Sequence, residues 1–168
     1  MGFGLISTTG KSMNFIALDE LNLGKKDDHY TKLKHIFDRT IELIEEYHPD
    51  EIAIEAPFYG KNVQSMLKLG RAQGVAMAAG LSRQVPITEY SPKKIKMSIT
   101  GSGNASKEQV AQMLKSLLKL KTLPKNLDST DGLAAAVCHH FNAGRVDTGK
   151  SYSGWGAFVK ANEKRVTK

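Results

Sequence analysis

Three acidic residues occupy positions where their carboxylates could bind metal ions. Glu55 ends a short apolar segment of alternating pattern, and open α/β sheets commonly carry functional groups at such strand ends. Asp128 and Asp131 are three residues apart at the expected start of a helix, so their side chains share one face. Oxygen ligands of this kind suit Mg²⁺ or Mn²⁺. Two such ions about 3.5–4 Å apart can activate a water and stabilise the leaving oxygen in phosphodiester hydrolysis.

Each of these acids also has an ordinary structural interpretation. A glutamate at a strand end can simply be exposed to solvent, and acids in a first helical turn stabilise the helix dipole by about 0.3–1 kcal/mol. Zinc chemistry is not favoured, because Cys138 is the single cysteine and lies in an apolar helical run. The adjacent His139 and His140 cannot face one site together.

The charge of the chain is divided unevenly along its length. Residues 1–60 contain 6 Lys and Arg against 11 Asp and Glu, a net charge of −5. Residues 61–125 contain 12 against 2, a net charge of +10, which indicates either a polyanionic partner or a solvated lysine surface. Phe58 and Tyr59 precede Lys61, where aromatic rings can stack on unpaired bases for about 1–3 kcal/mol each or fold back onto the core.

Length and composition limit the class of protein. The 168 residues are enough for one domain, and 40% of them are hydrophobic, as in a globular chain. No apolar run approaches the ~18 residues of a membrane span, so we expect no membrane partner. A lone cysteine excludes an internal disulfide and favours a reducing compartment.

Hydrophobic periodicity predicts a single α/β domain over residues 1–144, followed by a basic extension with a short helix over 145–168. Ser106 and Gln109 form a capping-box pattern, and Asp128 is expected to cap the last helix. Gly70 and Gly74 leave one side of a long helix without bulk, which indicates sheet packing or a dimer contact. Strands are expected over 2–8, 13–18, 51–55 and 85–90, and helices over 33–47, 62–81, 92–97, from 107 onward and from 128 to about 144.

Several of these motifs occur together in a known order. The sequence reads Ala53-Ile-Glu55-Ala-Pro-Phe58-Tyr-Gly-Lys61-Asn62, then Leu69-Gly70-Arg71-Ala-Gln-Gly74, then Lys96 and Gly101-Ser-Gly103 with Lys107, and finally Asp128-Ser-Thr-Asp131-Gly-Leu-Ala. In order and spacing, from about residue 2 to 141, it resembles the RuvC family of Holliday-junction resolvases.

The resemblance implies an RNase H-like fold, a mixed sheet flanked by helices, and a structure-selective endonuclease. It further implies a homodimer that makes paired symmetric nicks across four-way junction DNA, with the RuvA–RuvB branch-migration complex as partner in the bacterial cytoplasm. By motif position Glu55, Asp128 and Asp131 are expected to be catalytic acids that hold two Mg²⁺ ions, with Mn²⁺ as an alternative. The remaining residues expected at the site are Lys96 and Lys107 near the scissile phosphate and Phe58, Tyr59, Lys61 and Arg71 on the DNA.

One departure from the family pattern concerns the start of the chain. The family opens with a strand reading roughly Ile-Leu-Gly-Ile-Asp-Pro-Gly, whose Asp is a metal ligand, whereas residues 1–6 here match the second strand. Losing a central strand removes about 6–12 kcal/mol of burial, compared with about 5–15 kcal/mol of net stability in a domain. We therefore expect this sequence to be a truncated form, with three of four acids, that cleaves poorly. The alternative is a non-catalytic junction-DNA-binding protein.

Overall fold

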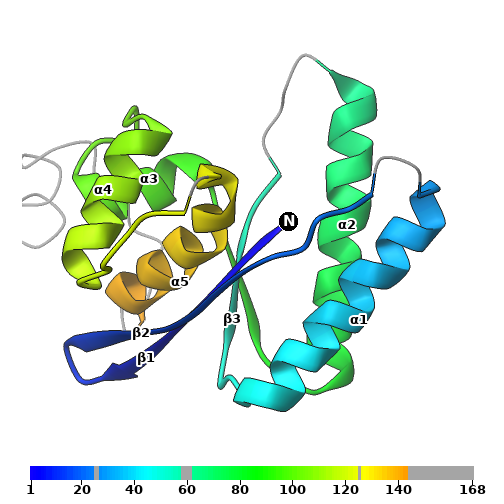
Figure 1. Cartoon of the computed structure of the whole chain (residues 1–168), viewed down its shortest axis with the longest axis horizontal. Coiled ribbons are helices and arrows are strands. Elements are labelled where there is room, and N and C mark those ends of the chain that lie inside the picture. The colour runs from blue at the N-terminus through cyan, green and yellow to red at the C-terminus, as the bar shows by residue number, and fades with distance from the viewer. Residues whose placement is uncertain (25–26, 58–61, 125, 144–168) are drawn as a thin grey trace, which may run out of the picture.

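The computed structural model describes residues 1–24, 27–57, 62–124 and 126–143 (Figure 1). The basic extension expected over residues 145–168 lies outside them. None of the described helices is long and apolar enough to cross a bilayer. In chain order the elements are β1 (Gly2–Thr9), β2 (Ser12–Glu20), α1 (His29–Tyr47), β3 (Ile52–Glu55), α2 (Val63–Ser82), β4 (Ile87–Tyr90), α3 (Pro92–Thr100), α4 (Lys107–Leu117), the 3₁₀ turn η1 (Leu127–Ser129) and α5 (Thr130–Asn142).

The strands form two separate pairs. β1 and β2 make an antiparallel hairpin whose register shifts between Leu5 and Ile6. β3 and β4 run parallel, with Glu55 opposite Tyr90, and α2 provides the crossover that a parallel pair requires. The fold therefore contains one antiparallel and one parallel pair of strands. Within the described residues no ladder joins β1 to β3, and one edge of each has no strand neighbour.

Helices cover the strands in two groups. α1 and α2 pack together on one side of β3, while α3, α4 and α5 gather on the other (Figure 1). α5 contacts both β1 and β3, and its Leu133, Val137 and Cys138 are fully buried. A Cβ atom at Gly132 would lie 2.7 Å from the carbonyl oxygen of Gly2. Glycine at this position therefore allows the first turn of α5 to approach the backbone of β1.

The helix starts follow the capping patterns of the sequence, with one exception. The Ser106–Gln109 capping box at α4 is confirmed by both of its hydrogen bonds. The prediction that Asp128 caps the last helix is wrong, because residues 127–129 form η1 and the N-cap is Ser129. A 3₁₀ turn here moves the helix start by one residue. α5 then ends at Asn142, slightly before the expected position.

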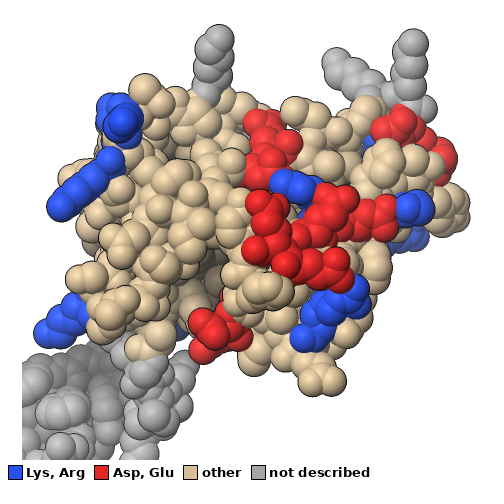
Figure 2. All heavy atoms as spheres, turned by 60° about the horizontal axis from the view of Figure 1, so that its bottom comes forward, with Lys and Arg blue, Asp and Glu red and all other residues tan. Residues whose placement is uncertain are grey.

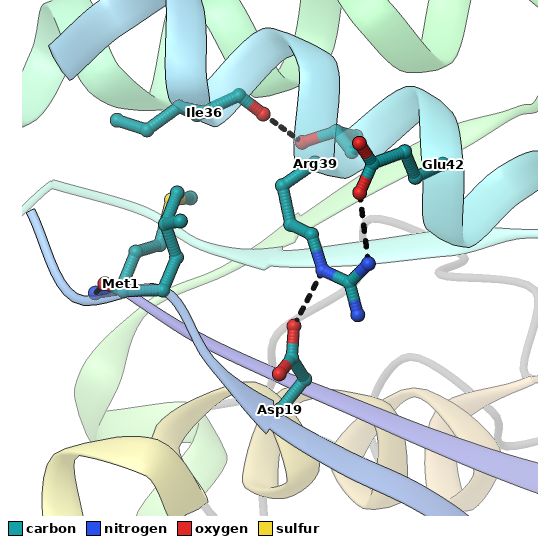
Figure 3. A network of polar contacts seen from close by, with 7 residues as sticks. Met1, Asp19, Ile36, Arg39 and Glu42 are labelled. Carbon is teal, nitrogen blue, oxygen red and sulfur yellow. Dashed lines mark hydrogen bonds and ion pairs between the residues drawn. The ribbon is translucent and has the colours of Figure 1, made fainter.

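A polar network ties the hairpin to α1 (Figure 3). The Arg39 guanidinium donates through Nε to Asp19 on β2 at 2.7 Å and through Nη1 to Glu42 at 2.8 Å. Hydrogen bonds to Glu42 and then Asp19 raise the pKa of Arg39. On the next residue of α1, the Thr40 hydroxyl donates to the carbonyl of Ile36, one turn earlier, at 2.7 Å. The contact between Arg39 and Asp19 thereby fixes β2 against α1.

Candidate active site

Glu55 is the last residue of β3, as the alternating pattern predicts. Its strand is anchored at that end because the Ala56 N–H donates to the Tyr90 carbonyl at 2.8 Å. The carboxylate is partly buried, and this burial raises its pKa; the charge of Asp131 raises it further. Lys107 and Lys96 act in the opposite direction. Glu55 and Asp131 are therefore close enough to repel, with two cations beside them.

Asp131 is held by its helix and by an ion pair. It lies in the first turn of α5, and Lys107 at the start of α4 donates to its Oδ2 atom at 3.1 Å. The two side chains are 43% and 50% exposed, so the pair remains open to solvent. The carboxylate is therefore available to a ligand from the solvent side.

These side chains line one cleft of about 140 Å³. Its walls come from β3, α3, α4 and α5, which are separated along the chain but meet at the carboxyl end of β3. Parallel strands in α/β folds commonly present functional groups at that end. The residues that line the cleft are Glu55, Pro92, Ile95, Lys96, Lys107, Val110, Thr130, Asp131 and Ala134. Four of the five residues expected to be catalytic are thus brought together.

The donor set of this cleft fits a hard divalent cation. Glu55 and Asp131 supply carboxylate oxygens, the ligands that Mg²⁺ and Mn²⁺ prefer. Burial and then the charge of Asp131 raise the pKa of Glu55, and a bound cation would favour the ionised carboxylate. The main chain of Asp128 lies in η1, directly before α5; its side chain is outside the described part of the structure. Among the described residues no group of three or more potential ligands occurs.

The residues expected to bind DNA are only partly placed. Phe58, Tyr59 and Lys61 lie outside the described residues. Arg71 is exposed on α2 and does not line the cleft.

Two polar residues near the site were not anticipated from the sequence. Thr130 lines the cleft and its hydroxyl donates to the Leu127 carbonyl at 2.6 Å, which closes the turn before Asp131. Gln73 of α2 donates to the main-chain oxygen of Glu55. The other buried residues of α2 are Ala76, Ala79 and Gly80, and one polar side chain at helical spacing from small apolar residues is a signal that would have singled out Gln73.

Acidic side chains gather on one face of the molecule. Figure 2 shows a large cluster of them around a few basic groups on the face turned toward the viewer. In the first half of the chain Asp19 and Glu42 pair with Arg39, and Glu45 pairs with Arg83. A surface of this charge repels polyanions.

Known proteins are similar to this chain in sequence and in fold. The family model described as crossover junction endodeoxyribonuclease RuvC matches residues 1–139. The chain belongs to the RuvC family. A RuvC of Christiangramia forsetii is 74% identical over 166 residues, which are 99% of this chain and 86% of that protein. A RuvC of Bacteroides fragilis is 57% identical over 168 residues, or 99% of this chain and 89% of that protein.

A solved RuvC structure agrees with the fold described above. T. thermophilus RuvC in complex with Holliday junction substrate superposes with a TM-score of 0.77 at 26% identity, covering 83% of this chain and 86% of that one. The resemblance drawn from the motifs is thus confirmed, together with the RNase H-like fold and the endodeoxyribonuclease class of the family.

Proposed function

We propose that this protein cuts four-way junction DNA by metal-assisted hydrolysis at the Glu55–Asp131 cleft. The observation that carries the proposal is the convergence of two carboxylates and two lysines from four elements. Membership of the RuvC family, whose T. thermophilus member was solved with a Holliday junction substrate, supports the choice of DNA. Asp128 is the third acid of the proposed set, placed by motif spacing in the turn before Asp131.

The residues of the cleft have distinct roles in this mechanism. Glu55, Asp131 and Asp128 hold the ions, two Mg²⁺ or Mn²⁺ in the proposed form. Bound ions supply an activated water and a Lewis acid for the leaving oxygen. Lys96 and Lys107 lie on the walls of the cleft, where their charges offset the negative charge that develops on the phosphate. Phe58, Tyr59, Lys61 and Arg71 are proposed to contact DNA beyond the cleft.

A second copy of the chain is proposed to bind along α2. Added Cβ atoms at Gly70 and Gly74 would meet nothing within 4 Å, so this face is not used for sheet packing inside the chain. Val63 and Leu67 continue the same stripe and are 64% and 51% exposed. An isologous contact there would give the dimer a twofold axis and present two clefts to the two equivalent strands of a junction. The RuvA–RuvB complex and the bacterial cytoplasm are proposed from the family.

The test is a nicking assay on synthetic four-way junctions with Mg²⁺, run on this chain and on a form that carries the family's first strand, because poor cleavage is expected without the Asp of that strand. The variants are made in the form that carries the strand. We expect Glu55→Gln to retain junction binding in a gel-shift assay and to lose cleavage by about 100-fold or more, because the variant keeps the side-chain volume but removes a metal-binding charge. Glu89→Gln is the matched control, since Glu89 is exposed on the neighbouring β4 and does not line the cleft. Cleavage by Glu55→Gln at the rate of the unmodified protein would overturn the site assignment.

A further inference from the structure

A second hollow borders α3 and shares no lining residue with the cleft. This α3–α5 groove has a volume of about 720 Å³ and lies between α3 and the last residues of α5. Its polar lining residues are Ser91, Lys93, Lys94, Ser98 and Asn142. No Asp or Glu is among the described residues that line it. Unlike the cleft, the groove therefore offers positive charge without a carboxylate to hold a metal ion.

Both lysines of the groove are exposed, yet each is held by its neighbours. The Nζ atom of Lys94 lies 5.4 Å from the centroid of the Tyr90 ring, in a cation–π contact. The Tyr90 hydroxyl is 2.9 Å from Nδ1 of His139 on α5, and this contact orients the ring. The stem of Lys93 runs over Gly103, where an added Cβ would lie 2.6 Å from the lysine Cγ. Neither lysine takes part in an ion pair within the described part of the chain, so their charge is placed but not neutralised.

Two serine hydroxyls add hydrogen-bond donors to the same groove. The Ser98 Oγ atom accepts from Cys138 Sγ and from Asn142 Nδ2, each at 3.3 Å. The Ser91 Oγ atom accepts from the Lys94 N–H at 3.2 Å, which caps α3. Each hydroxyl is an acceptor in the contacts that the described residues make, which leaves its own hydrogen for a ligand in the groove. Serine hydroxyls and lysine ammonium groups commonly donate to phosphate oxygens of nucleic acids.

α3 presents positive charge to the cleft and to the groove together. Lys96 lines the cleft, whereas Lys93 and Lys94 line the groove, and the three lie within about one turn of the helix. Each strand of a DNA duplex carries one phosphate per ~3.4 Å of helix axis. The lysines of α3 are therefore spaced as closely as the phosphates of a strand that leaves the cleft. An acidic polypeptide would match the charge, but this continuity with the cleft favours DNA.

We propose that the α3–α5 groove binds the sugar–phosphate backbone of a junction arm beyond the cleft. The proposal rests on the function proposed above and deepens it, because it gives the same DNA substrate a second contact on this chain. Lys93 and Lys94 supply the charge, and the two serine hydroxyls supply hydrogen bonds that fix the register of the backbone. None of these residues lines the cleft, so the groove contributes affinity and leaves the chemical step unchanged.

The experiment measures binding of a four-way junction in EDTA from about 50 to 200 mM salt, in the form that carries the family's first strand. The double variant Lys93→Gln with Lys94→Gln is expected to make the slope of log K against log salt shallower by about 2, since each phosphate contact contributes ~0.9. At ~0.15 M salt the same contribution weakens binding by about 30-fold. Lys32→Gln with Lys34→Gln on α1 removes the same charge away from the groove and should change the slope by less than about 0.5. Single-turnover cleavage at saturating protein and Mg²⁺ should stay within about twofold.

Neutral methylphosphonates, placed singly along the arms, locate the contact. Where a phosphate lies in the groove, the replacement should weaken binding of the unmodified protein and leave binding by the double variant unchanged. A slope that the double variant keeps overturns the proposal and leaves the groove to an acidic polypeptide. A shallower slope without any such position also overturns it, because the charge then acts only at a distance. These readouts need no cleavage, so normal cleavage by Glu55→Gln would remove the proposed function by a separate result.

Discussion

One substitution in the ion pair between Lys107 and Asp131 can distinguish an effect on the cleavage rate from an effect on the stability of the fold. Lys107→Met keeps a flexible side chain of similar length on α4 but removes the charge that lies 3.1 Å from the Asp131 carboxylate. It also removes one of the two cations that oppose the raised pKa of Glu55. The cleft is left with two carboxylates and Lys96.

The two consequences differ greatly in size. Both partners of the pair are about half exposed, and ion pairs of this kind contribute about 0–1 kcal/mol to stability. Removing a preorganised group that stabilises charge in a transition state costs about 10²–10³ in rate, or ~2.7–4 kcal/mol. The loss of cleavage is therefore expected to exceed the loss of stability several-fold.

The assay is single-turnover cleavage of a labelled four-way junction at saturating protein and Mg²⁺, beside thermal unfolding of the same samples. Lys34→Met is the control, because Lys34 forms an exposed ion pair with Asp38 on α1, outside the cleft. Both variants are expected to unfold within a few degrees of the unmodified protein, since about 1 kcal/mol shifts the melting temperature of a domain this size by ~2–8 °C. Only Lys107→Met should cut slowly. Cleavage by Lys107→Met within about threefold of normal would refute the proposed electrostatic role.

Two further predictions concern the charge of Glu55 and the face of α2. Because burial and then Asp131 raise the pKa of Glu55, the folded state binds its proton more tightly than the unfolded chain does. Ionised Glu55 therefore destabilises the metal-free fold, and Glu55→Gln should raise the melting temperature at pH 7 in EDTA. Gly74→Glu adds a charged side chain to a face that is open within the chain, so it should leave the monomer folded and abolish the dimer in sedimentation velocity.

Each of these predictions has a defined contrary result. The gain from Glu55→Gln should disappear as the pH falls below 4.5, the ordinary pKa of a glutamate, because the carboxyl is then neutral in both states. A gain that persists there would show that charge is not its cause. For the dimer, His35→Glu on an exposed part of α1 is the matched control and should sediment as the unmodified protein does. A dimer that survives Gly74→Glu would exclude this face as the interface.

Features of the fold that depend only on residues close together in the sequence could be predicted from the sequence. The Ser106–Gln109 capping box and the strand that ends at Glu55 were predicted correctly, since each depends on neighbouring residues. The predicted N-cap at Asp128 was wrong by one position because a 3₁₀ turn precedes α5, and such turns are frequent at helix ends. The division of the strands into two pairs was not predicted, because hydrogen bonding between strands is set by long-range packing.

The sequence by itself determined which chemical groups are available and on which kind of element each one stands. Glu55 at a strand end and Asp131 in a first helical turn follow from short-range patterns. Only the tertiary structure decided that Lys107 pairs with Asp131 across 24 residues, and that Gln73 reaches back 18 residues to the carbonyl of Glu55. Such contacts form because α5 packs against β3 and α4 while α2 packs against β4, and the energy of that packing is a property of the assembled core rather than of any local segment.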